Sequence, residues 1–153
     1  WLEAELKRTG HTPTIVSQGK VDDPDAPRVR VIWPRANAPA GAEQANAQSV
    51  AVLVDIPGGM LVTGDQGRES QERFVREVEP VRIAVVPHHG SSDQSERLDA
   101  KIAFISVGEN SYGHPSRRAF ELYSSADVYD TKSCGTIVVT GSEVASRCEG
   151  PRG

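Results

Sequence analysis

Four side chains able to bind metals fall at the ends of expected strands between residues 65 and 114 of this 153-residue chain. They are Asp65, the adjacent His88 and His89, and His114. Side chains at the carboxyl ends of neighbouring strands in an α/β sheet converge on one crevice. Because imidazole and carboxylate groups together bind zinc, manganese or iron, the pattern predicts a metal site at this edge.

Each of these residues also has an ordinary structural explanation. Asp65 precedes an expected helix, where aspartate often forms a turn or caps the N-terminus. His114 precedes a proline and carries little weight alone, whereas two adjacent imidazoles between an apolar strand and Gly90 have little structural use. The remaining histidine, His11, follows an expected helix stop and is expected to be a plain surface residue.

Hydrophobic periodicity predicts the elements that would position this site. Helices are expected at 2–7, 68–78, 93–100 and 116–125, strands at 15–16, 29–33, 50–56, 60–63, 83–86, 102–107 and 128–129, a closing hairpin at 136–140 and 143–146, and loops at 17–27 and 34–48. From residue 59 onward strands and helices alternate, which is typical of an α/β domain with a largely parallel sheet.

Composition limits the class of protein. The net charge is −4 and the pI is near 5.6, so the strongly basic surface of a nucleic-acid-coating protein is absent. No apolar run approaches the roughly 18 residues of a membrane span, and no signal-peptide pattern precedes the first helix. The sequence also lacks the GxGxxG, P-loop, HExxH, CxxC and GxSxG motifs. The remaining chemistry is metal-assisted hydrolysis, or none.

Several segments together match one family. They are residues 62–65 (VTGD), 86–91 (VPHHGS), 105–116 (ISVGENSYGHPS), 130–131 (DT), 135–138 (GTIV) and 46–49 (NAQS). In order and spacing they resemble the metallo-β-lactamase-like domain at the C-terminus of ComEC-type DNA-uptake channel proteins. The resemblance covers about residues 28 to 140, which is most of the chain.

The resemblance implies the second half of a four-layer αββα sandwich. Residues 1–140 would form the partial domain, and 141–153 a C-terminal hairpin and tail. The family's first signature, His-x-His-x-Asp-His, is not in the sequence, so the missing N-terminal half is an expected partner. The chain alone is expected to be inactive and to hold few metal ions or none. The parent would be a membrane protein with this domain on the extracytoplasmic face.

The activity that the resemblance implies is metal-dependent hydrolysis of DNA, with single-stranded DNA as the expected substrate. Two ions, manganese or zinc, would lie about 3.5–4 Å apart in the complete domain. Asp65 would bridge them and His114 would bind the second ion. His89, in preference to His88, would contact the phosphate or protonate the leaving group. Expected substrate-binding residues are Ser91, Asn46 and Ser49.

Two other functions fit the same residues. One is a catalytically inactive remnant of the fold with a role in assembly or DNA contact. The other is a hydrolase acting on another phosphoester or on a small molecule. A His-x-His-x-Asp-His segment upstream in the reading frame would favour an enzyme over a remnant.

The two cysteines, Cys134 and Cys148, lie nearly opposite each other across the expected closing hairpin. The turn at Gly141–Ser142 would bring them within the range that a disulfide requires. A disulfide would agree with an extracytoplasmic location. The alternative is two unrelated thiols, one of them in a frayed C-terminal tail.

Overall fold

Seven strands in chain order form the main sheet of the protein. The computed structural model describes residues 6–10, 19–21, 29–35, 45–94 and 98–151. Its elements are β1 (Gly19–Val21), β2 (Val29–Trp33), η2 (Asn46–Gln48), β3 (Ala51–Val54), β4 (Met60–Val62), α2 (Arg68–Phe74), η3 (Val75–Glu77), β5 (Val81–Val85), η4 (Pro87–Gly90), β6 (Ala100–Ile105), α3 (Arg117–Leu122), β7 (Asp127–Asp130), α4 (Thr131–Cys134), β8 (Val138–Thr140) and β9 (Glu143–Ala145).

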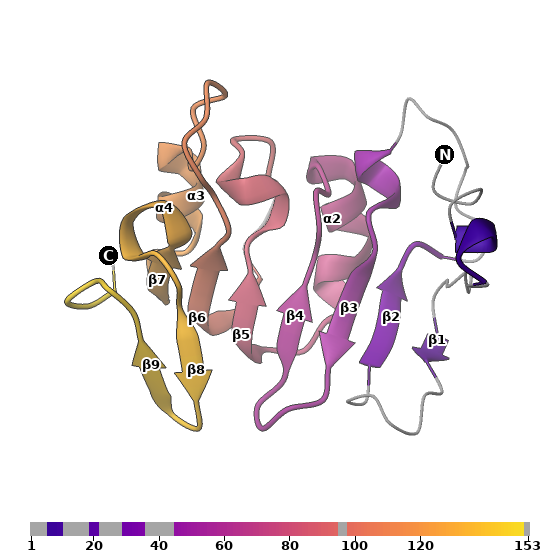
Figure 1. Cartoon of the computed structure of the whole chain (residues 1–153), viewed down its shortest axis with the longest axis horizontal. Coiled ribbons are helices and arrows are strands. Elements are labelled where there is room, and N and C mark those ends of the chain that lie inside the picture. Colours follow the sequence, from indigo (N-terminus) through magenta and orange to yellow (C-terminus); the bar gives the residue numbers. More distant parts are fainter. Residues whose placement is uncertain (1–5, 11–18, 22–28, 36–44, 95–97, 152–153) are drawn as a thin grey trace.

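The sheet is mixed, with an antiparallel half and a parallel half (Figure 1). Strands β1 to β4 pair antiparallel, and β4 to β7 pair parallel. The β3–β4 hairpin turns through Gly58 and Gly59, both at positive φ, a region that glycine enters without steric cost. The expected α/β class with its parallel half is therefore confirmed.

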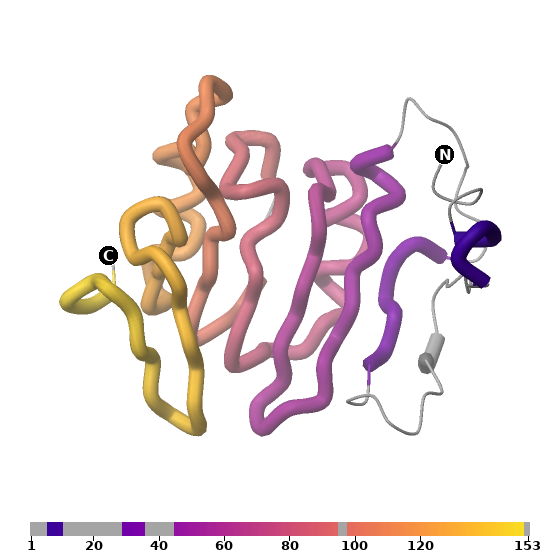
Figure 2. The backbone as a smooth tube through the Cα atoms, viewed as in Figure 1, coloured from indigo at the N-terminus to yellow at the C-terminus, as the bar shows by residue number. Residues whose placement is uncertain are grey.

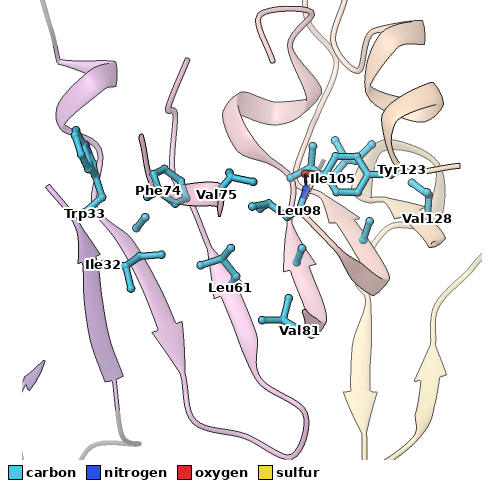
Figure 3. Close-up of a cluster of buried hydrophobic side chains, with 14 of the residues drawn as sticks. Ile32, Trp33, Leu61, Phe74, Val75, Val81, Leu98, Ile105, Tyr123 and Val128 are labelled. Atoms are coloured by element: carbon cyan, nitrogen blue, oxygen red, sulfur yellow. Dashed lines mark hydrogen bonds between the residues drawn. The ribbon is translucent and has the colours of Figure 1, made fainter. Parts of the chain in front are cut away.

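One face of the sheet is packed against the helices (Figure 3). Phe74 and Val75, from α2 and η3, join a cluster that includes Leu61 of β4. The ring of Tyr123 lies in the same cluster, and its hydroxyl accepts a hydrogen bond from the Leu98 amide at 3.5 Å. This core explains the apolar faces of the two expected long helices, which the structure forms as 68–74 and 117–122.

The opposite face carries in-register rows of apolar side chains. One row runs from β2 to β7 through Val31, Val52, Val62, Val85, Phe104 and Tyr129. The β8–β9 hairpin covers the β7 end of this face, where Val139 and Val144 pack with Tyr129. Val52, Val62 and Val85 are half-buried and belong to neither of the clusters formed by the described residues.

Several expectations about elements need correction. Residues 19–21, expected to be a loop, form edge strand β1, which is too short to show periodicity. The helix expected at 93–100 is not formed at its described residues 93, 94 and 98–100, and Ala100 begins β6. A helical turn, α4, follows β7 where none was expected. Most of the helix expected at 2–7, the strand at 15–16 and residues 36–44 of the expected loop at 34–48 lie outside the described residues.

The closing hairpin forms as expected, with Val138 opposite Ala145 and Thr140 opposite Glu143. Cys134 and Cys148 are joined by a disulfide, and their Cα atoms are 4.7 Å apart. The bond ties α4 to the segment that follows β9. Among the described residues, no helix combines the length and hydropathy needed to cross a bilayer.

Removing the disulfide should lower the free energy of unfolding by about 3 kcal/mol, the effect of opening a loop of about 15 residues. The bridged cysteines are 14 positions apart. The test is urea denaturation of the chain with and without reductant, beside Cys148→Ser. The Cys148→Ser variant should have the same urea midpoint as the reduced chain, and adding reductant should not change that midpoint. Equal urea midpoints for oxidised and reduced chain would contradict the prediction.

Candidate functional site

Parallel pairing brings three loops to one edge of the sheet, and Figure 2 shows these loops side by side above β4, β5 and β6. They contain Asp65, then His88 and His89, and then the segment 106–116, which includes His114. The convergence expected from the order of strands is therefore present. His11 lies outside the described residues.

The histidine loop has an unusual backbone. His88 and His89 have φ values of 47° and 54°, and Gly90 follows at 77°. The left-handed region costs a non-glycine residue of order 1 kcal/mol or more, so the surrounding structure must hold the loop. The His88 amide donates to the Gly64 carbonyl at 3.0 Å, and the Ser116 amide donates to the Gly90 carbonyl at 2.8 Å.

Gly90 could not be replaced without moving its neighbours. A Cβ atom on Gly90 would lie 2.8 Å from the Cβ of Pro115, closer than side chains approach. The absence of a side chain at residue 90 therefore lets the histidine loop pack directly on the loop that carries His114. Close packing of these two loops sets the ring centroids of His88 and His114 5.7 Å apart.

His89 links the other two loops. Its Nδ1 lies 2.6 Å from the Ser106 carbonyl oxygen, and its Nε2 lies 3.3 Å from Oδ1 of Asp65. With Nδ1–H donating to Ser106, Nε2 donates to Asp65 in the imidazolium form and offers a lone pair in the neutral form. Its geometry therefore suits a group that holds or releases a proton beside a carboxylate.

His114 is held by one asparagine. Oδ1 of Asn110 accepts hydrogen bonds from the amides of Tyr112 and His114, at 3.1 and 3.0 Å. Nδ2 of Asn110 donates to the carbonyls of Gly108 and His114, at 2.9 and 2.8 Å. One side chain thus fixes the backbone of the turn that carries His114.

The electrostatic setting of His114 favours the neutral imidazole. Burial lowers the pKa of His114 below its usual value, and the nearby His88 and His89 lower it further. A neutral imidazole is the form that binds metal ions. Within the described residues, the Nδ1 atoms of His88 and His114 are buried and find no hydrogen-bond partner, which is costly unless another group satisfies them.

A cavity of about 470 Å³ opens between these loops. Its size falls within the range of ligand pockets in proteins. The lining residues come from the histidine loop, the segment after β6 and the start of α4: His89, Ser106, Val107, Gly108, Asn110, Tyr112, His114 and Thr131. Thr131 joins the start of α4 to the segment after β6, since its hydroxyl donates to the Val107 carbonyl at 2.7 Å.

The expected substrate-binding residues are placed less centrally. Ser91 is buried, and its hydroxyl accepts from the Asp93 amide at 2.9 Å, which is a local turn contact outside the cavity lining. Ser49 lies beside Gly64, where an added Cβ would come within 2.9 Å of it. Asn46 is exposed in η2.

Sequence reasoning missed several residues that shape the site. Ser106, Asn110, Tyr112 and Thr131 all fall within the matching segments, but the sequence alone indicates no role for any of them. Buried glutamines also brace the loops: Nε2 of Gln66 donates to the Ser49 carbonyl at 2.6 Å. The available signal was a set of polar side chains in otherwise apolar surroundings, which periodicity does not distinguish from surface positions.

The donor set fits only part of a metal site. The unpartnered nitrogens of His88 and His114 and the carboxylate of Asp65 are suitable ligand atoms. However, no group of three or more His, Cys, Asp or Glu side chains positioned to hold an ion occurs among the described residues.

Comparisons with family models, with curated proteins and with solved structures find no significant match.

Replacing Asn110 by alanine should loosen the 108–114 turn, because four hydrogen bonds are lost. We expect a destabilisation of about 1–3 kcal/mol and faster hydrogen exchange at the amides of Tyr112 and His114. Exchange followed by NMR measures this directly. Asn46→Ala, at an exposed asparagine in η2, is the control and should leave both amides protected. Unchanged exchange in Asn110→Ala would refute this role.

Proposed function

We propose that the chain is the second half of a metallo-β-lactamase-like αββα domain that hydrolyses phosphodiesters, with DNA as the substrate, in a ComEC-type DNA-uptake protein. The observation that carries this proposal is the meeting of Asp65, His88, His89 and His114 at the carboxyl edge of the parallel strands, where His89 and His114 line a cavity. The family resemblance of these same loops supplies the reaction class.

The chain's own residues would bind and orient the diester. His89 reaches Asp65 through Nε2 and the Ser106 carbonyl through Nδ1, so its proton lies at the edge of the cavity. In this proposal the imidazolium form of His89 donates its Nε2 proton to the leaving oxygen and becomes neutral. The Ser106 carbonyl, which accepts from Nδ1–H, holds the ring while the Nε2 proton moves from Asp65 to that oxygen.

Asp65 and His114 would contribute ligands to a centre of two manganese or zinc ions. When bound, such ions activate water and neutralise charge that develops on the phosphate. The lowered pKa of His114 supports this role, because the neutral ring is available near pH 7. Further ligands would come from the His-x-His-x-Asp-His segment in the first half of the domain.

The half-buried sheet face supports the proposed partner. Val52, Val62 and Val85 form part of an apolar row, and none of the three belongs to the cluster that the β8–β9 hairpin covers. A second sheet packed here would give the inner ββ layers of the sandwich. The disulfide supports an extracytoplasmic location for the domain, since such bonds persist in oxidising compartments.

The hydrolase is tested in the longer protein that contains this chain, with bis(p-nitrophenyl) phosphate and Mn²⁺. Asp65→Ala should lower kcat/KM by at least about a hundredfold, because it removes a metal ligand. It should also remove Mn²⁺ measured by elemental analysis. Glu143→Gln, at an exposed carboxylate on β9, is the matched control and should keep both.

Turnover in Asp65→Ala equal to the parent would refute the hydrolase. Absence of both metal and turnover in the parent would favour the inactive remnant. Turnover of nucleotides or small phosphoesters in preference to DNA would favour the other hydrolase.

The 153-residue chain alone should associate through its apolar sheet face. Sedimentation velocity should show species larger than the monomer, and Val62→Lys should shift the chain toward monomer. Val138→Lys, at a 51% exposed site on β8, is the control and should not. A monomeric wild-type chain with a sharp cooperative melt would contradict the proposed partner.

A further inference from the structure

One aromatic side chain that lines the cavity is almost fully exposed to solvent. Tyr112 is 82% exposed, the highest value among the exposed large hydrophobic residues of the described chain. It lies in the loop between β6 and α3, which rises above the edge of the sheet in Figure 1. It also lines the cavity beside His89 and His114.

The ring of Tyr112 is held in place despite its exposure. It stacks on His114, with ring centroids 6.1 Å apart and an angle of 28° between the planes. Its backbone amide is fixed by Asn110, which also fixes His114. One face of the ring is therefore occupied and the other faces solvent, so a ligand that stacks there orders little that is not already ordered.

We propose that Tyr112 is a stacking platform for a nucleobase of single-stranded DNA whose phosphate lies at His89 and His114. This inference rests on the proposed function and deepens it. In a nucleotide, a single sugar separates the base from the phosphate. The Tyr112 ring stacks directly on His114, so a phosphate at His114 would place the attached base near Tyr112. Every base offers a π-face, so such a platform binds without sequence preference.

The platform also addresses the charge of the chain. With a net charge of −4, attraction between phosphates and a basic surface cannot supply general affinity for DNA. Stacking on an aromatic ring adds affinity that does not depend on charge. It further selects single strands, because the faces of bases in a duplex are already covered by neighbouring bases.

The test measures binding of the 153-residue chain by fluorescence anisotropy to a fluorescein-labelled thymidine oligomer and to an abasic oligomer of equal length. Both probes carry the same phosphates, so the difference in affinity isolates the bases. The wild-type chain should prefer the thymidine oligomer by about tenfold. Tyr112→Leu should lose this preference, while Tyr112→Phe and Tyr112→Trp should keep it.

Val138→Ala is the control at another exposed apolar residue, and its preference should equal that of the wild type. Equal affinity of the wild type for both oligomers, or no binding of either, would overturn the platform. A Tyr112→Leu chain that loses affinity for both oligomers equally would also overturn it, because Tyr112 would then act through His114. The hydrolase is tested separately, because bis(p-nitrophenyl) phosphate contains no nucleobase. A chain that keeps its preference for the thymidine oligomer while the longer protein shows no turnover would refute the hydrolase and leave the platform standing.

Discussion

The candidate site depends on a short run of left-handed backbone at His88, His89 and Gly90. In an ordinary extended exit from β5, successive side chains would point to opposite faces of the sheet. The left-handed turn instead directs one imidazole toward Asp65 and the other toward the ring of His114. The conformation persists because it is bonded to the loops on both sides, through the Gly64 carbonyl and the Ser116 amide.

The parallel half of the sheet provides the frame for that turn. Strand β5 lies between β4 and β6, so the order of the strands alone makes the loops that follow them neighbours. Strand order and apolar periodicity can be inferred from the sequence, and together they predict that Asp65, the histidine pair and His114 meet at one edge of the sheet. The positive φ at His88 could not be predicted, because few histidines adopt the left-handed region and no local sequence pattern indicates it.

The same contrast separates other parts of the fold. The β3–β4 and β8–β9 hairpins and the cysteine pair follow from turn residues close in sequence. Strand β1 does not, since it is held by its pairing with β2 and not by a pattern of its own. The turn α4 has a local cap, the Asp130 carboxylate accepting from the Ser133 amide, but four residues are too few to show a helical period. Asn110 illustrates this most clearly: a polar loop residue by composition, it accepts and donates four hydrogen bonds that shape the site.

Unfavourable features of the molecule concentrate where the chemistry is proposed. The two left-handed histidines, the unpartnered Nδ1 atoms of His88 and His114, and the exposed ring of Tyr112 lie close together, and His89, Tyr112 and His114 line one cavity. Each feature lowers stability, and none serves the packing of the helix-covered core. A protein that keeps such features together, and holds them with a dedicated asparagine and a glycine contact, is better explained by binding than by folding. A ligand that satisfied the nitrogens and covered the ring would remove these costs at once.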